Sequence, residues 1–312
     1  MTKNDWDVIV IGEGGAGLCA AVTAREAGQE ILLLSKGPIG RGCATAYSGG
    51  LFSVAVEGMT MEEHRRRSLE CGRDLNERHL LNVLVEKAPA RVLGLRRYGV
   101  QLELSRGLAT CGPYAPSPVL GGIPLTTGLW KAARELGVAV QNGRLATNLT
   151  ADGGSTTVET ECLEKFRVEA WRAKAVVVAT GGGASIFGRN DNPGGATGDG
   201  YALLFQCGAP FEDMEFVQFY PLGFADPGFF AWNPSVGILN DVRLTNSAGD
   251  SFIHRLLPTW GMKSMAEAGL FARAQGTLAV AQQWKAGHEV YLYLNELTPE
   301  QWQQRYLGSL LR

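Results

Sequence analysis

Patterns for metal sites and disulfide frameworks are scarce in this sequence. It has six cysteines and four histidines among 312 residues, and no two cysteines stand at the Cys-x-x-Cys spacing of structural zinc sites. We therefore predict no metal site and no disulfide framework. Reduced thiols are typical of a cytoplasmic protein, and the first predicted strand begins too close to Met1 to leave room for a signal peptide.

Long apolar runs and a surplus of positive charge are also absent. No apolar stretch reaches the ~20 residues that a membrane-spanning helix needs, so we expect no membrane span. The net charge is −2, whereas a protein that binds nucleic acid needs a surplus of lysine and arginine on one face. We therefore expect a cytoplasmic protein whose main partner is not nucleic acid.

Glycine, in contrast, is abundant, at 41 of the 312 residues against a usual share of about 7%. The first glycines follow a short β-branched run at residues 7–11 and precede a helical segment at 16–27. A second buried run follows at 30–34. This β-α-β order predicts an α/β fold with a parallel sheet.

The rest of the chain shows further helical and β patterns. Helical segments are predicted at 61–99 with a break near Pro89, at 129–136 and at 266–286. Strands are predicted at 144–174 as an antiparallel meander, at 175–179 as a third buried strand, and at 290–294. The basic cluster from His64 to Arg67 is interpreted as a solvated helix face, and the Gly/Pro-rich residues 110–128 as a loop long enough to bind a ligand.

The glycines after the first strand form the pattern Gly12-x-Gly14-Gly15-Ala16-Gly17. In such a motif the first glycine allows a tight turn, the next lets the backbone approach a pyrophosphate, and the last lets helix and strand pack closely. The N-terminus of the helix then presents free N–H groups to the anion. The motif therefore predicts a dinucleotide site.

The end of the second predicted strand departs from a simple NAD site. Such a site has an acidic residue there to bind the ribose hydroxyls, but this chain has Ser35 and Lys36. Lys36 could favour the 2′-phosphate of NADP, or the pair could belong to a flavoprotein variant of the fold. The motif leaves both alternatives open.

Several segments farther along resemble one protein family. They are residues 35–51 (SKGPIGRGCATAYSGGL), 179–182 (ATGG), 197–200 (TGDG), 218–223 (QFYPLG) and 290–294 (VYLYL). In this order they resemble the flavoprotein subunits of succinate dehydrogenase and fumarate reductase and the related aspartate oxidases. The resemblance implies a Rossmann-like FAD-binding domain with a parallel sheet and a β-meander over residues 1–223, and an incomplete α+β capping domain over 224–312.

The resemblance also implies a role for individual residues. The glycine motif would hold the pyrophosphate, Ser35 and Lys36 would lie by the adenosine ribose, and Asp199 would lie near the flavin end. The full predicted cofactor set is Gly12, Gly14, Gly15, Ala16, Gly17, Ser35, Lys36, Cys43, Ala44, Thr45, Ser48, Gly49, Gly50, Ala179, Thr180, Gly181 and Asp199.

Several positions depart from the family pattern. Cys43 replaces the histidine that links the flavin covalently, so we expect FAD bound without a covalent bond. Tyr220 and Leu222 replace a substrate-binding histidine and threonine, and Arg273 is the nearest match to the proton-transferring arginine. Because these changes remove donors that a dicarboxylate needs, we expect Tyr220 and Arg273 to serve a substrate other than succinate or fumarate.

The family's last segment, which returns to the flavin, has no counterpart before Arg312. We therefore expect a second polypeptide that completes the flavin site, or an iron–sulfur subunit. The predicted function is an FAD-dependent oxidoreductase that moves two electrons between a small substrate and an electron carrier. The alternative is a flavin-bearing electron-relay or scaffold subunit without its own substrate site.

Overall fold

The computed structural model describes residues 5–112, 120–223, 236–264 and 273–302. The chain forms two compact units. The first comprises residues 1–115 and 119–212, and the second comprises residues 116–118 and 213–312. The division into an FAD-binding and a capping domain near Gly223 stays a prediction, and the first unit ends at Glu212.

A six-stranded sheet forms the centre of the first unit, in the order β6-β2-β1-β9-β8-β7. Four neighbouring strands are parallel: β6 (Ala139–Asn142), β2 (Ile31–Ser35), β1 (Asp5–Ile11) and β9 (Arg167–Val178). The antiparallel strands β8 (Ser155–Cys162) and β7 (Arg144–Asp152) continue the sheet as a meander. The predicted α/β class with a mainly parallel sheet is confirmed.

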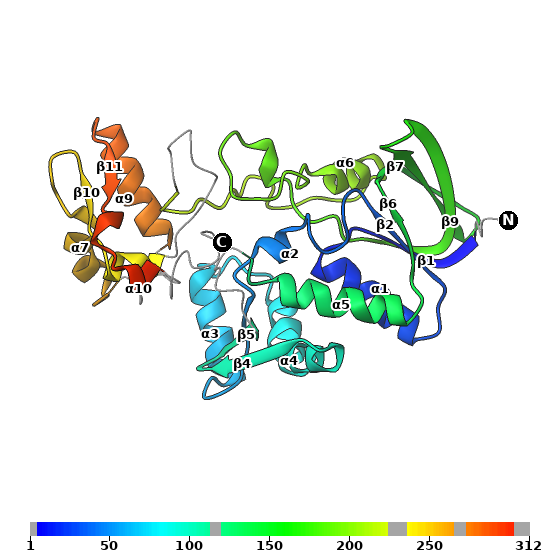
Figure 1. Cartoon of the computed structure of the whole chain (residues 1–312), viewed down its shortest axis with the longest axis horizontal. Helices are drawn as coiled ribbons and strands as arrows, with labels where there is room; N and C mark the ends of the chain where they lie inside the picture. The colour runs from blue at the N-terminus through cyan, green and yellow to red at the C-terminus, as the bar shows by residue number, and fades with distance from the viewer. Residues whose placement is uncertain (1–4, 113–119, 224–235, 265–272, 303–312) are drawn as a thin grey trace. The chain divides into compact units, whose positions relative to one another are not determined.

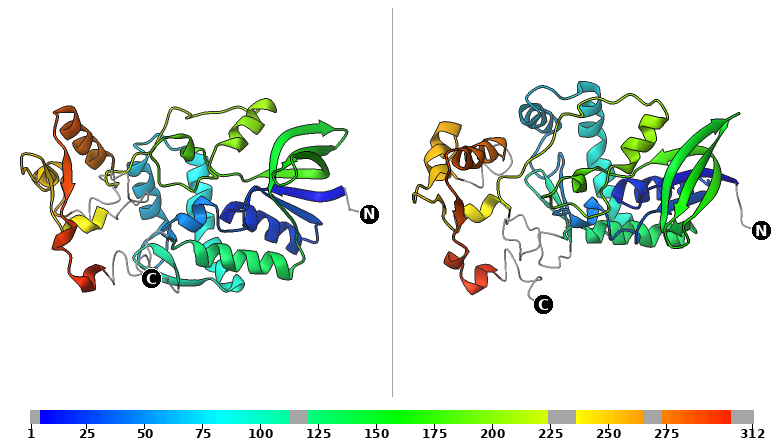
Figure 2. Two further views of the ribbon diagram at one scale, coloured as in Figure 1. Left: turned by 45° about the horizontal axis from the view of Figure 1, so that its top comes forward. Right: turned by 90° about the horizontal axis from the view of Figure 1, so that it is seen from above.

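Helices cover both faces of this sheet, because alternate residues of its central strand are apolar on both sides. Alternate residues of a strand point to opposite faces, and Val10 packs against α1 (Gly15–Glu26) and α5 (Ile123–Glu135). These two helices lie side by side in Figures 1 and 2. Ile9 and Ile11 face the other side, where they join Leu203 of α6 (Asp199–Gln206) in a second core.

The last strand of the meander and the third parallel strand are one element. We predicted them as separate segments, but β9 runs without a break through both. Its first part pairs antiparallel with β8 from Arg167 to Ala173, and its later part pairs parallel with β1 from Arg172 to Val178. The alternating and the continuously apolar patterns therefore belong to the two halves of one strand that changes its partners.

The helical region after residue 60 differs from its prediction at two points. It contains α3 (Met61–Cys71), α4 (Arg78–Gly94) and the 3₁₀ helix η1 (Leu95–Tyr98), and Pro89 lies inside α4. The break falls at residues 72–77, where Arg73 and Asp74 have positive φ. The arginines of the basic cluster pair with glutamates on α3 as expected for a solvated face, but His64 is wrongly included because it is buried.

A small antiparallel sheet of β3 (Leu51–Ser53), β5 (Leu108–Gly112) and β4 (Gln101–Ser105) lies in the same unit. The short helix α2 (Ala44–Tyr47) precedes it. Residues 113–119 of the predicted binding loop lie outside the described residues, and α5 begins at Ile123, before that loop was predicted to end.

The second unit has its own small core. Strands β10 (Leu244–Asn246) and β11 (Val290–Leu292) pair antiparallel, and α7 (Phe252–Leu256) packs against β10. The predicted helix at 266–286 is described from Arg273, where α9 (Arg273–Lys285) begins. The remaining elements are η3 (Val236–Asn240), η4 (Leu257–Trp260), η5 (Leu294–Glu296) and α10 (Pro299–Gln301). Within the described part of the chain, no helix combines the length and apolar character needed to cross a bilayer.

Candidate cofactor site

The glycine motif joins three elements so closely that side chains would not fit. Gly12 has φ +115°, and a Cβ there would lie 2.2 Å from the carbonyl oxygen of Ala179 at the end of β9. A Cβ on Gly17 would lie 1.9 Å from the carbonyl oxygen of Gly12. Glycine is therefore required for β1, α1 and the end of β9 to meet at one point.

The start of α1 faces the loop that follows β2. Gly14 is the N-cap of the helix and no side chain caps it. The N–H of Gly15 donates a hydrogen bond to Oγ1 of Thr45 at 3.1 Å, which fixes α2 against the start of α1. A helix start presents backbone N–H groups and a positive dipole end, and both favour the binding of a phosphate anion.

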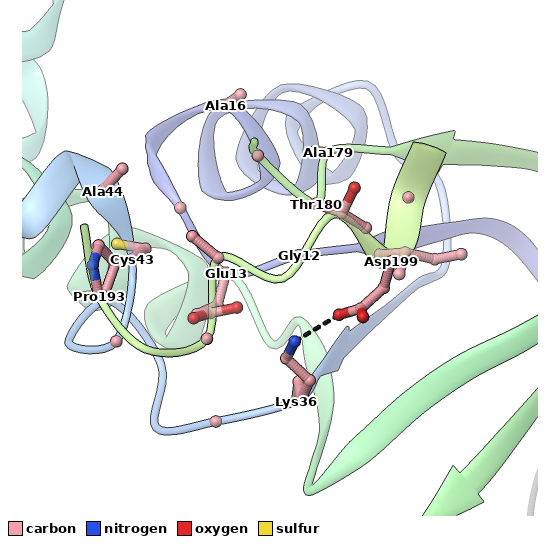
Figure 3. Close-up of a pocket in the computed structure, with 18 of the residues that line it drawn as sticks. Gly12, Glu13, Ala16, Lys36, Cys43, Ala44, Ala179, Thr180, Pro193 and Asp199 are labelled. Atoms are coloured by element: carbon pink, nitrogen blue, oxygen red, sulfur yellow. Dashed lines mark hydrogen bonds and ion pairs between the residues drawn. The ribbon is translucent and has the colours of Figure 1, made fainter. Parts of the chain in front are cut away.

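A cavity of about 410 Å³ opens beside this helix start, within the usual range of roughly 300–1,000 Å³ for ligand pockets. Figure 3 shows residues from the glycine turn, from the loop after β2 and from residues 179–199 around it. Twelve residues of the predicted set line it: Gly12, Gly14, Gly15, Ala16, Lys36, Cys43, Ala44, Thr45, Ala179, Thr180, Gly181 and Asp199.

Five residues of the predicted set do not line this cavity. Gly17 packs under Gly12, and the buried Ser35 donates its hydroxyl to the Gly37 carbonyl at 2.6 Å. Ser48, Gly49 and Gly50 form a second close contact, because a Cβ on Gly50 would lie 2.1 Å from the carbonyl oxygen of Gly121 before α5. Their part in binding a flavin ring stays a prediction.

Lys36 and Asp199 meet in the cavity wall. Lys36 follows β2, Asp199 is the first residue of α6, and their side chains form an ion pair (Figure 3). Oγ1 of Thr197 lies 2.7 Å from Nζ of Lys36 and 2.8 Å from Oδ1 of Asp199. The contact brings the two side chains to the same part of the cavity, and their predicted roles, Lys36 by the adenosine ribose and Asp199 near the flavin end, stay predictions.

Sequence reasoning missed part of the wall. Residues 144–146 at the start of β7 line the cavity. So do Pro193, Gly195 and Ala196, in the segment 193–196. The latter directly precedes the Thr-Gly-Asp-Gly motif, so its nearness to Asp199 could have indicated it. No local pattern marks residues 144–146, because the pairing of β6 with β2 brings them to the site.

Cys43 lies where the family that the motifs resemble has the histidine that links the flavin covalently. Burial is the largest effect and raises the pKa of its thiol; a hydrogen bond from the Ala46 backbone lowers the pKa in part, and the charge of Glu13 raises it again. A raised pKa leaves less of the nucleophilic thiolate at neutral pH. The environment of Cys43 therefore disfavours a covalent link.

The two predicted catalytic residues lie together in the second unit. The guanidinium of Arg273, at the start of α9, lies over the ring of Tyr220 at 5.1 Å from its centroid. Nε of Arg273 is buried and has no hydrogen-bond partner among the described residues. Thr277 of α9 donates a hydrogen bond to the carbonyl of Phe219 at 3.4 Å, so α9 packs directly against the segment that carries Tyr220.

Comparison with known proteins decides the family. A family model described as the FAD binding domain matches residues 7–300. The chain belongs to this FAD-binding family. The FAD cofactor expected from the sequence is thereby confirmed, whereas its non-covalent attachment stays a prediction.

Individual relatives of this FAD-binding chain include proteins of the family predicted from the motifs. L-aspartate oxidase of Streptomyces coelicolor is 32% identical over 235 residues, which cover 69% of this chain and 40% of the relative. A mitochondrial succinate dehydrogenase flavoprotein of Xenopus laevis is 29% identical over 99% of this chain and 49% of its own length. This chain therefore spans less than half of the length of each of these two relatives.

Solved structures agree with this fold. Quinol fumarate reductase of E. coli superposes with a TM-score of 0.81 at 24% identity, over 98% of this chain and 56% of that one. The match shows a shared fold, and together with the two relatives it confirms the resemblance.

The residues at the cavity fit FAD and do not favour NADP. The helix start can bind a diphosphate with backbone N–H groups, which need no cationic side chain. Lys36, the candidate for a 2′-phosphate, is already paired with Asp199, so an added phosphate there would meet a carboxylate. The glycines leave the room that a closely bound cofactor needs.

Proposed function

We propose that this chain carries the flavin of an FAD-dependent oxidoreductase that moves two electrons between a small substrate and an electron carrier. The main support for this proposal is the cavity at the start of α1, which is lined by the glycine motif and by the Lys36–Asp199 ion pair. A bound flavin supplies hydride and one-electron chemistry. The residues described here bind and orient it.

We further propose a substrate other than succinate or fumarate. Leu222 is only 6% exposed and offers no hydrogen bond where a dicarboxylate site would need a donor. Tyr220 offers one hydroxyl, and its ring supports the Arg273 guanidinium. An arginine is always charged and has five N–H donors, so this pair suits a substrate with one anionic or carbonyl group to be bound.

A partner that completes the redox chain is part of this proposal. One relative is named a flavoprotein subunit of succinate dehydrogenase, and this chain spans about half of that subunit's length. We propose that a second polypeptide completes the flavin site, or that an iron–sulfur subunit takes the electrons. An iron–sulfur cluster needs several cysteine ligands in one place, and the described residues contain no group of side chains that could hold a metal ion.

The experiment loads the chain with FAD, reduces the flavin with dithionite under anaerobic conditions, and offers fumarate, other enoates and one-electron carriers. Reoxidation by an organic acceptor supports an enzyme. Reoxidation by one-electron carriers alone supports the alternative, a flavin-bearing relay or scaffold subunit.

Two variants locate the substrate site. Tyr220→Phe keeps the ring under Arg273 and removes the hydroxyl, whereas Tyr220→Leu removes both. We expect turnover of the organic acceptor to fall by about 100-fold in Tyr220→Leu and less in Tyr220→Phe, with reoxidation by one-electron carriers unchanged. Tyr291→Phe, on β11, is the matched control. Full turnover in Tyr220→Leu would exclude Tyr220 from the site.

A further inference from the structure

The first variable position of the glycine motif carries an acidic residue, Glu13, and its side chain is directed into the cavity. Figure 3 shows the carboxylate on the cavity side of the glycine turn, apart from the Lys36–Asp199 pair. A Cβ on Gly42 would lie 3.8 Å from Oε1 of Glu13. The carboxylate therefore lies against the loop that leads to Cys43, where a cofactor held by α1 must pass.

No cation of the described cavity wall compensates this carboxylate. Lys36 and Arg144 are the cationic side chains among the described lining residues. Lys36 pairs with Asp199, and Arg144 pairs with Glu169 at 2.8 Å, where both side chains are 14% exposed. No described residue donates a hydrogen bond to Glu13 or forms an ion pair with it.

An uncompensated carboxylate beside a diphosphate has two possible effects of opposite sign. It repels the negative phosphates, or it accepts hydrogen bonds from neighbouring hydroxyl groups, which an ionised carboxylate does strongly. Simple dinucleotide sites use an acid at the end of the second strand for such hydroxyls. Here that position has Ser35, whose hydroxyl is bound to Gly37, and Lys36, which is only a donor.

We propose that the Glu13 carboxylate is a cofactor-binding group that accepts hydrogen bonds from sugar hydroxyls of the FAD. It takes the place of the acid that is missing after β2, but it comes from the turn between β1 and α1. Asp199 is less suited to this role because its oxygens are engaged by Lys36 and Thr197. This inference rests on the proposed function of the cavity as an FAD site.

The test measures the Kd of FAD by quenching of flavin fluorescence for the wild-type chain and three variants. We expect Glu13→Ala to bind FAD roughly tenfold more weakly, the loss typical of one hydrogen bond to a charged group. Glu13→Gln keeps an uncharged acceptor of the same shape, and we expect a loss of about threefold. Glu103→Gln removes a charge on β4, away from the cavity lining, and should leave Kd unchanged.

A second ligand identifies which hydroxyls are bound. ADP contains the adenosine ribose and the diphosphate but no ribityl chain. If Glu13→Ala weakens ADP and FAD equally, the ribose donates to Glu13; if it weakens FAD alone, the ribityl chain does. Both results support the proposal.

The proposal fails if Glu13→Ala and Glu13→Gln bind FAD as tightly as the wild type, or more tightly because repulsion has been removed. Should Glu13→Ala not fold by circular dichroism, Glu13→Gln decides the question. If the wild-type chain itself binds no FAD, the proposed function of the cavity fails instead.

Discussion

At the scale of single residues, both cationic side chains of the described cavity wall, Lys36 and Arg144, are held in ion pairs. Lys36 is neutralised by Asp199 across two segments that lie far apart in the sequence, and the diphosphate is left to backbone N–H groups at the start of α1. This arrangement explains why a lysine after β2 does not make the site specific for NADP. Cofactor choice here depends on contacts that a linear motif does not display.

Cys43 provides a residue-scale prediction about pH. Because burial raises the pKa of its thiol, the thiolate fraction at neutral pH is lower than in an unfolded chain. We expect Cys43 to react with iodoacetamide more slowly in the folded protein than in urea, with the rate still rising above the pH at which the unfolded thiol levels off. Peptide mass spectrometry measures this, with the exposed Cys207 as reference.

The covalent alternative at Cys43 has its own outcome. Acid precipitation of FAD-loaded protein should release all flavin into the supernatant. A yellow pellet, or a Cys43 that is labelled at neutral pH as fast in the folded protein as in urea, would contradict the account of a protonated, non-nucleophilic thiol.

At the scale of elements, the glycine turn is the contact that could be predicted most fully. Gly12 and Gly17 were expected to allow a tight turn and close packing, and the distances to Ala179 and Gly12 show both. A motif of this kind is predictable because its cause is local: the backbone has no room for a Cβ. Residues 144–146 could not be predicted in this way, since strand pairing across the sheet places them.

Two predictions were wrong because the composition of a short segment pointed one way and the packing of the folded chain another. Pro89 suggested a helix break, but α4 continues through it and the chain turns at Arg73 and Asp74 instead. Likewise His64 shares a basic run with three arginines, yet it is buried in the folded protein. In both cases tertiary packing overrides the composition of a short segment.

The element-scale prediction concerns Gly17→Ala. Its new methyl group would lie 1.9 Å from the Gly12 carbonyl oxygen, and backbone cannot move aside as a side chain can. We expect a loss of about 3 kcal/mol in the free energy of unfolding, measured by urea titration, and weaker FAD binding. Gly94→Ala is the control, because Gly94 ends α4 in helical conformation with open space around it; its stability should be unchanged or slightly higher. Equal stabilities of the two variants would contradict the close contact.

At the scale of the whole molecule, the chain consists of two compact units with separate cores. FAD contacts assigned to the first unit should stabilise that unit, because a ligand that binds only the folded state shifts its unfolding equilibrium. Whatever the second unit contributes to substrate binding, its own unfolding should respond less to FAD.

Calorimetry tests this expectation. With FAD at about 100 times its Kd, the free energy of unfolding of the first unit should rise by roughly 2.7 kcal/mol. The corresponding Tm should rise by about 5–10 °C, with a smaller change in the second transition. Riboflavin, which lacks the adenosine diphosphate, should have little effect. An equal shift of both transitions by FAD, or none, would contradict the assignment.

The unbroken strand β9 also limits how chains of this family can vary in length. One residue inserted within it would turn every following side chain of the strand to the opposite face. The change would extend to the turn at Ala179, which contacts Gly12 beside the cofactor site. Residues 163–166, between β8 and β9, can absorb the same insertion without that error. Evolutionary insertions should therefore accumulate in the hairpin loop between β8 and β9 and not within β9. The loop can then vary in length while the side chains near Ala179 keep their orientation.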